Sequence, residues 1–339
     1  AAGSKRMQSA NTFPPIIIDS ERAIAPDLSE YQDGVLYLQG IKRGSDEYVN
    51  PFKKYLEKAV SYYLTKKTLL YAEKPHPFYE LYVCNDIKYH KYHLTGVRDT
   101  KPEITISDAT VEKLEAESKY IIIEGIGGIG KSMFLTHLFL SSAQNSTYSS
   151  VVPLFLSLKD YKDTTDNVVD FIWKSICEYD SKISKKDIIE ALQNKELILL
   201  LDGFDEIQTS VRESFQSDLE AFIKSYNGNT IIMTSRPIYD SFVSFSKFSV
   251  FDIKPLTKKQ ALALIDKLEF WDEIAKKSFM EALDNKLYYS HLQFASNPLL
   301  LTIMLMTYSS FGEVPAKMHV FYSKAYETMA RLHDASKGS

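Results

Sequence analysis

Three things are scarce in this sequence. Only two cysteines, Cys84 and Cys177, occur in 339 residues, which excludes a disulfide-rich secreted framework and a zinc site of closely spaced cysteines. No apolar run reaches the roughly 18–20 residues of a membrane span, because Lys, Asp or Gly interrupts each candidate. Basic residues number 40 against 44 acidic ones, so the net charge is −4 and no global positive field exists to hold nucleic acid. We expect a cytoplasmic protein in a reducing compartment, with no membrane span and no indication of nucleic acid binding.

The composition is that of an ordinary globular protein, with 45% hydrophobic and 25% charged residues. The length predicts about two domains, or one large domain with a helical appendage. The first four residues, Ala1 to Ser4, precede no hydrophobic signal core and resemble a cloning remnant. We therefore expect both ends of the chain to be artificial boundaries.

Residues 1–77 match no motif, and we expect them to form an N-terminal segment or linker of unknown role. Apolar residues spaced by three and four predict an amphipathic helix from Asn50 to about Lys67, with Lys66 and Lys67 at its solvated end. The run 78–83 is interpreted as a strand, and 104–106 as another short one. The alternatives for this region are the tail of an effector domain or a linker beside a nucleotide base.

The pattern then changes to short apolar runs that alternate with helical or loop sequence. This alternation predicts an α/β domain with a parallel sheet over residues 78–254. After Pro255 the runs have helical spacing, so residues 255–339 are predicted to form a helical domain. The predicted strands are 120–124, 151–158, 197–202, 230–235 and 248–253, and the predicted helices are 258–268, 271–283, 298–308 and 316–332.

The strongest motif follows the first of these strands. It reads Gly125-Ile126-Gly127-Gly128-Ile129-Gly130-Lys131-Ser132 and continues into Met133 and a helical run. Glycines allow the backbone N–H groups to face phosphate oxygens, and the helix N-terminus adds a favourable dipole. Lys131 supplies a positive charge and Ser132 a hydroxyl for Mg²⁺. The motif predicts a phosphate-binding loop; the alternative is a glycine-rich turn with an incidental lysine.

Charged residues follow two later strands of the predicted sheet. Asp202 ends the strand 197–202, where a carboxylate can hold magnesium, and Asp205 and Glu206 lie just beyond it. Either of the latter two is a candidate to orient or deprotonate an attacking water, the alternative being helix-start charges. Arg236 ends the strand 230–235 and is a candidate sensor of a γ-phosphate, the alternative being a surface arginine before Pro237.

Other clusters are read as structural. His90 and His93 with Cys84 and Asp86 lack the spacing of a metal site. The aromatics between Phe52 and Tyr92 are interpreted as core, or as a surface covered by a missing domain, rather than as a stacking platform. Trp173 and Trp271 lie on amphipathic helices and are predicted to be core.

Taken together, five strings resemble the NACHT family of STAND signalling ATPases in order and spacing. A GTPase is disfavoured because the nearest base-reading string, Asn194 to Leu197, lies before the Asp202 strand and lacks the aspartate. The resemblance covers about residues 78–338, and the closing string 333–338 resembles the bacterial branch. The five strings are Gly125 to Ser132, Asp202-Gly203-Phe204-Asp205-Glu206, Thr234-Ser235-Arg236-Pro237, Ile253-Lys254-Pro255-Leu256-Thr257 and Asn297-Pro298-Leu299-Leu300-Leu301.

The resemblance implies an ATP/ADP-dependent switch with slow hydrolysis, an ADP-bound closed state and ATP-driven homo-oligomerisation. It implies that Lys131, Ser132 and Asp202 serve phosphate and Mg²⁺, that Asp205 and Glu206 support hydrolysis, that Arg236 is the sensor and that Pro298 lies against the base. The trigger ligand and effector are unknown, and an ADP-clamping winged-helix domain is expected to be missing from this chain. By family analogy the role is bacterial innate immunity or antiphage defence. The alternatives are an AAA+-like remodelling ATPase and a nucleotide-dependent scaffold.

Overall fold

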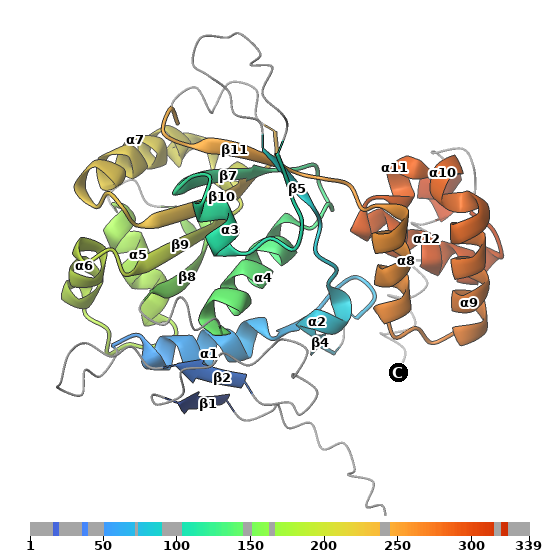
Figure 1. Ribbon diagram of the computed structural model, residues 1–339, viewed down its shortest axis with the longest axis horizontal. Coiled ribbons are helices and arrows are strands. Elements are labelled where there is room, and N and C mark those ends of the chain that lie inside the picture. The colour runs from blue at the N-terminus through green and yellow to red at the C-terminus, as the bar shows by residue number, and fades with distance from the viewer. Residues whose placement is uncertain are drawn as a thin grey trace, which may run out of the picture.

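A seven-stranded sheet with helices around it forms the larger part of the molecule, and a group of helices lies beyond one edge of the sheet (Figure 1). The computed structural model describes residues 16–19, 36–39, 51–71, 74–89, 104–144, 151–162, 167–237, 245–314 and 320–324. His90 and His93 lie outside these residues, as does most of the predicted helix 316–332.

The strand order of the large sheet is β6-β5-β11-β7-β10-β9-β8. Strands β8 to β11 and β7 run parallel, whereas β5 and β6 are antiparallel additions at one side. The parallel strands match the predicted runs closely, which confirms the predicted fold class of a parallel sheet with flanking helices followed by a helical region. Their bounds are β7 Tyr120–Glu124, β8 Val152–Ser157, β9 Leu197–Asp202, β10 Thr230–Ser235 and β11 Ser249–Ile253, with β5 Ile87–Tyr89 and β6 Ile104–Ile106.

The inner strands are apolar and buried on both faces, which is why their sequences read as continuous hydrophobic runs rather than alternating ones. Because β10 pairs with both β7 and β9, it separates the strand that leads into the glycine-rich loop from the strand that ends in Asp202. The surrounding helices are α3 Val111–Glu115, α4 Lys131–Gln144, α5 Val168–Cys177, α6 Lys185–Gln193 and α7 Thr209–Ser225, with 3-10 turns η3 Leu158–Asp160 and η4 Phe204–Glu206.

Local sequence signals set several helix starts. Ser184 and Asp187 form a capping box at the start of α6, and Thr257 and Gln260 form another at the start of α8 (Lys258–Lys267). Gly312, at φ +72°, ends the helix α12 (Pro298–Phe311) in a left-handed conformation.

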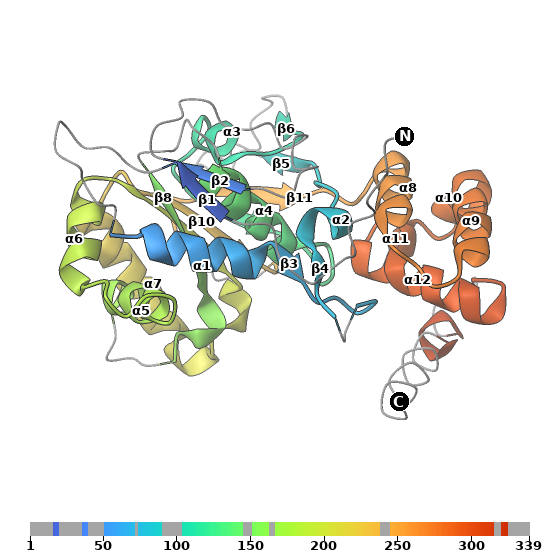
Figure 2. The same ribbon diagram turned by 90° about the horizontal axis from the view of Figure 1, so that it is seen from below.

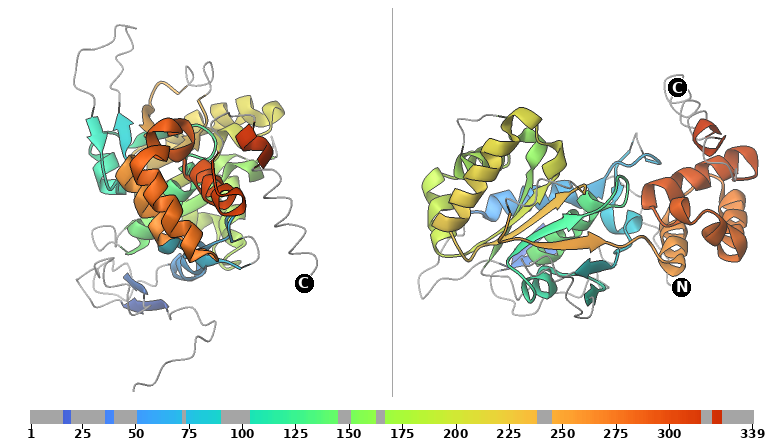
Figure 3. Two further views of the ribbon diagram at one scale, coloured as in Figure 1. Left: turned by 90° about the vertical axis from the view of Figure 1, so that its right-hand side faces the viewer. Right: turned by 90° about the horizontal axis from the view of Figure 1, so that it is seen from above.

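The helical subdomain follows β11 and has its own hydrophobic core. It is drawn in orange and red, and the right-hand view of Figure 3 shows it set off from the sheet. Trp271 was predicted to be core but is 59% exposed, because α9 begins only after it and its ring packs against Phe270 at the surface. Besides α8 and α12 the subdomain contains α9 Glu273–Ala282, the π-helical turn η6 Leu283–Leu287, α10 Tyr288–Ser290 and α11 Leu292–Ala295.

The N-terminal segment packs on the sheet through α1 (Lys53–Tyr63), which crosses the molecule in the view from below (Figure 2). The Tyr55 hydroxyl accepts a hydrogen bond from the backbone N–H of Phe155 at 3.0 Å, so α1 covers the outer strand β8. An edge strand is protected in this way from pairing with another chain. A separate parallel pair, β1 (Ile16–Asp19) and β2 (Leu36–Gln39), precedes α1.

Two predictions for this segment are wrong. The helix predicted to reach Lys67 ends at Tyr63, and a short hairpin of β3 (Thr65–Lys66) and β4 (His76–Pro77) follows. The strand predicted over 78–83 is the helical turn α2 (Phe78–Leu81). Phe78 and Tyr82 stack at 5.0 Å, an i,i+4 contact of a helical turn, and this contact outweighs the strand propensity of the aromatics.

Candidate functional site

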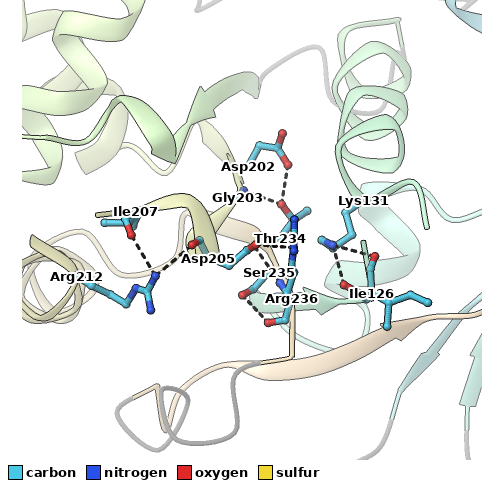
Figure 4. A network of polar contacts seen from close by, with 11 residues as sticks. Ile126, Lys131, Asp202, Gly203, Asp205, Ile207, Arg212, Thr234, Ser235 and Arg236 are labelled. Carbon is cyan, nitrogen blue, oxygen red and sulfur yellow. Dashed lines mark hydrogen bonds and ion pairs between the residues drawn. The ribbon is translucent and has the colours of Figure 1, made fainter. Parts of the chain in front are cut away.

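The glycine-rich loop connects β7 to α4 at the carboxyl edge of the sheet, as the sequence predicts for a strand-loop-helix unit. The Lys131 ammonium folds back over the loop and donates hydrogen bonds to the carbonyls of Gly125, at 2.7 Å, and Ile126, at 3.2 Å (Figure 4). Burial lowers the pKa of Lys131, and the nearby carboxylates of Asp205, Asp202 and Glu206 oppose that effect. The lysine therefore lies within the electrostatic reach of all three acidic residues.

The loop needs glycine at two positions in particular. A Cβ at Gly125 would lie 2.7 Å from Ile129 Cγ2, so the loop closes too tightly there for any side chain. Gly128 has φ +76°, and a Cβ on it would lie 2.9 Å from both Asn297 Oδ1 and Leu299 Cβ. The second constraint comes from the helical subdomain, which the motif alone does not reveal.

Two of the motif residues are accessible. Ser132 is exposed in the first turn of α4, and Ile126 is exposed at the top of the loop. Ile129 is buried beneath the loop, and Met133 contacts the cores of both the sheet and the helical subdomain.

Thr234 connects β10 to the end of β9. Its hydroxyl donates to Asp202 Oδ1 at 2.7 Å and accepts a hydrogen bond from the backbone N–H of Gly203 at 2.8 Å. Gly203 itself is left-handed at φ +82°, which turns the chain sharply after Asp202. Sequence reasoning gave Thr234 no role, although its position one residue before the end of the neighbouring strand was the available signal.

Asp205 and Arg236 form an ion pair. Arg236 Nε lies 3.0 Å from Asp205 Oδ2, and the Arg236 backbone N–H donates to Asp205 Oδ1, also at 3.0 Å. Arg212, which the sequence did not single out, donates to the carbonyls of Asp205 and Ile207 at 3.1 Å each. The Asp205 carboxylate is therefore engaged with Arg236, whereas Glu206 is exposed and its side chain lies against Gly203.

The helical subdomain contacts the loop backbone directly. Asn297 Nδ2 donates to the Gly127 carbonyl at 3.0 Å, and the Leu299 N–H donates to the Gly128 carbonyl at 3.3 Å. Asn297 is 2% exposed and also caps α12 by accepting from the N–H groups of Leu299 and Leu300. Pro298, predicted to lie against a base, approaches Gly130 on the same side of the loop.

One further carboxylate lies at the end of β7. Burial, with a smaller effect from Asp252, raises the pKa of Glu124 to about 7. Glu124 and Asp252 are paired in register across β7 and β11, which explains their mutual repulsion.

The predicted metal donors suit Mg²⁺. An exposed hydroxyl on Ser132 and a carboxylate on Asp202 lie at the same edge of the sheet, and Mg²⁺ prefers few protein oxygens with the remainder from water and phosphate. Within the described ranges, no group of three or more His, Cys, Asp or Glu side chains forms a separate metal site.

No helix of the described part of the chain combines the length and the apolar character that crossing a membrane requires.

This fold and this site define a P-loop nucleotide-binding domain. Residues 119–269 match the family model of the NACHT domain, which is consistent with a NACHT-family P-loop NTPase and agrees with the motif resemblance. No curated protein sequence matches the chain.

Solved structures that resemble the chain are distant. Domain III of the replication initiation protein DnaA of Thermotoga maritima shows 15% identity over 65% of this chain and 88% of that chain, with a TM-score of 0.35. PCH-2 of C. elegans shows 13% identity over 88% of this chain and 78% of that chain, also at 0.35. A Thermotoga maritima RuvB variant shows 12% identity over 66% and 65%, at 0.31.

Proposed function

We propose that this protein is an ATP/ADP-binding signalling switch of the NACHT/STAND class, with slow hydrolysis that is regulatory. The observation that carries the proposal is the contact between the helical subdomain and the phosphate-binding loop. The Asn297 side chain and the Leu299 N–H donate hydrogen bonds to the carbonyls of Gly127 and Gly128. A change in the loop backbone therefore changes the position of α12. A switch requires such a coupling between the ligand site and a second structural element.

In this proposal each residue at the sheet edge has a separate role in binding the nucleotide and Mg²⁺. Lys131 moves from the loop carbonyls to the phosphates, and the loop N–H groups bind phosphate oxygens. Ser132 and Asp202 would hold Mg²⁺, which neutralises developing negative charge when bound. Thr234 fixes the Asp202 carboxylate through its hydroxyl. Pro298 borders the loop where we propose that the base lies.

Hydrolysis is assigned to Glu206 rather than equally to both acidic residues. The Asp205 carboxylate accepts from Arg236 through both of its oxygens, which makes it a positioning group for the sensor arginine. Glu206 is exposed at the same edge and has a carboxylate available to orient an attacking water. Arg236 can read a γ-phosphate only by loosening its contact with Asp205, which gives the site a means to distinguish ATP from ADP.

Rapid-quench kinetics with radiolabelled ATP test the switch against a continuously cycling remodelling ATPase. We expect a burst of about one ADP per chain and then a slow steady phase that matches the separately measured rate of ADP release. Glu206→Gln should abolish the burst and keep ATP binding, while Asn297→Ala should speed ADP release and keep the burst. A linear time course with rapid ADP release would contradict the switch and favour the remodelling ATPase.

Oligomerisation and a role in bacterial immunity are proposed from family analogy alone. Light scattering on the Glu206→Gln variant should show a larger species with ATP and a monomer with ADP. Phage challenge of a bacterial host that expresses the wild-type chain or Lys131→Ala should show protection only with the former. Equal sizes with both nucleotides, or equal protection by both chains, would contradict these two extensions.

A further inference from the structure

Lys66 lies in the short hairpin that joins α1 to α2, outside the residues that match the NACHT domain. One backbone bond closes the base of the hairpin, and the residues that follow the hairpin bond to α8. The Phe78 N–H donates to the Leu64 carbonyl at 2.7 Å, and the Lys267 ammonium of α8 donates to the carbonyls of Tyr79 and Tyr82. The segment therefore spans from the sheet to the helical subdomain, and its hairpin has a defined position between them.

The position of Lys66 follows from the aromatic residues beneath it. Its Nζ lies 4.5 Å from the centroid of the Tyr63 ring. That ring packs on Phe139 of α4 at 5.2 Å and on Phe155 of β8 at 4.5 Å. Phe155 lies two residues before Ser157, which is paired in register with Asp202. These contacts place the Lys66 ammonium on the side of β8 and α4, and the charge of Asp202 that acts on it indicates that it lies towards the carboxyl end of β9.

The Lys66 ammonium has no ionic partner among the described residues. Its contacts there are the Tyr63 ring and, at 6.0 Å, the Tyr62 ring, and the charge that reaches it is the carboxylate of Asp202. Burial lowers the pKa of Lys66 to about 8, so the group stays mainly protonated at pH 7. A half-buried cation with only aromatic contacts is costly unless an anion joins it.

The other cations of the site already have partners. Lys131 donates to two loop carbonyls and Arg236 pairs with Asp205. Lys66 lies over Tyr63, which packs on β8 and α4, and β8 is the strand that pairs with the Asp202 end of β9. Lys66 can therefore take up a new negative charge beside Asp202 without giving up a hydrogen bond or an ion pair among the described residues.

We propose that Lys66 is a phosphate-binding residue supplied by the N-terminal segment, and that its ammonium contacts the terminal phosphate of a nucleoside triphosphate beside Asp202. The inference rests on the proposed function, because it requires that the loop binds a nucleotide. A diphosphate lacks the group that Lys66 contacts, so the N-terminal segment distinguishes the two nucleotides. The hairpin would pass this difference to the helical subdomain through Lys267.

Calorimetric titration of the full chain with ATPγS and with ADP, both with Mg²⁺, tests the inference. Lys66→Met should weaken ATPγS binding about tenfold, the effect of one charge-assisted hydrogen bond, and change ADP binding less than about twofold. Lys66→Arg should restore the ATPγS affinity, because it keeps a cation. Lys67→Met is the matched control: it removes the exposed neighbouring ammonium and should change neither affinity.

A second readout separates binding from folding. Thermal unfolding without nucleotide should show a midpoint for Lys66→Met that is no lower than that of the wild type, because no ion pair is lost among the residues that the structure describes and the burial of the ammonium is itself costly. Hydrogen exchange of the hairpin strands, at the amides of Thr65, Lys66 and His76, should slow with ATPγS but not with ADP in the wild type, and the difference should vanish in Lys66→Met.

The outcomes distinguish the two proposals. If the wild type binds both nucleotides and Lys66→Met weakens both equally, or neither, the role of Lys66 is wrong while the nucleotide site stands. If the wild type binds no nucleotide, the proposed function fails and the role of Lys66 fails with it.

Discussion

The two flanks of the phosphate-binding loop are held by different kinds of contact. Towards the helical subdomain the contact is made by backbone carbonyls and close packing, at Gly127, Gly128 and Leu299. On the other side of the loop, at the sheet edge, charged and hydroxyl side chains contact one another, with Arg236 on Asp205 and Thr234 on Asp202. Close packing permits few arrangements, whereas side-chain ion pairs exchange partners easily. The first flank is suited to transmit a change and the second to detect one.

The largest expected loss of stability comes from a substitution where the loop packs on the helical subdomain. Gly128→Ala should lower the free energy of unfolding by about 2–5 kcal/mol, from left-handed strain and from the 2.9 Å approach to Asn297 and Leu299. Gly312→Ala is the control, because Gly312 is also left-handed but has nothing within 4 Å of its Cβ position. It should cost about 1–2 kcal/mol. Urea unfolding measures both, and equal costs would show that the loop does not pack on α12 as described.

On the sheet-edge flank, Thr234→Val should cost about 2–3 kcal/mol. The substitution keeps the shape but leaves the Gly203 N–H without its acceptor and Asp202 Oδ1 without its donor. Thr307→Val is the control, since Thr307 is equally buried but its hydroxyl bonds only a helical carbonyl. The control should cost less than about 1 kcal/mol by the same urea assay. Equal losses would mean that Thr234 only fills space.

His137 lies where α4 meets the N-terminal segment. Its ring stacks on Tyr82 at 5.1 Å and contacts the Tyr79 hydroxyl at 3.4 Å. Burial lowers the pKa of His137 to about 4, against weaker opposing effects of the Ala109 backbone and Asp108. The folded state keeps the imidazole neutral while the unfolded state takes up a proton below about pH 6.5. Stability from this group is therefore present above pH 6.5 and is lost as the pH falls towards 4.

The expected loss from His137 is about 2 kcal/mol between pH 7.5 and pH 5. The pH dependence of unfolding should be correspondingly less steep in His137→Gln, which has no titrating ring. Unfolding curves at several pH values in this range check it. The same slope in both proteins would show that folding leaves the pKa of the imidazole unchanged.

The smallest free-energy change is expected for the ion pair of Asp205 and Arg236. Asp205 is 15% exposed in its side chain and Arg236 63%, so solvent screens their attraction. A double-mutant cycle with Asp205→Ala and Arg236→Ala should give a coupling free energy of about 0.5 kcal/mol that shrinks with added salt. A coupling of several kcal/mol would contradict the view that this flank exchanges partners easily.

The sheet and its loop were predictable because each has a local signal. The strands β7, β9 and β10 are uninterrupted apolar runs, and their predicted bounds agree with the structure. The order of strands brings Lys131, Asp202, Asp205 and Arg236 to one edge, as we expected from their places at or after the ends of the predicted strands.

The remaining features depend on contacts between distant parts of the chain. Asp205 was predicted to share catalysis with Glu206, but no sequence pattern shows that Arg236 bonds to its carboxylate. Lys66 was interpreted as part of a solvated helix end, because nothing local predicts that the chain turns into a hairpin over Tyr63. Trp271 lies on a helical pattern but before the first turn of α9, so its spacing indicated burial that the fold does not provide.

The central claim is that the loop from Gly125 to Ser132 binds and retains a nucleotide. Denaturing extraction of the purified chain, followed by chromatography of the released small molecules, tests it most directly. We expect about one adenine nucleotide per wild-type chain, mainly ADP, and none from Lys131→Ala. Equal nucleotide content in both proteins, or an empty wild-type chain that takes up neither added ADP nor ATP, would contradict it.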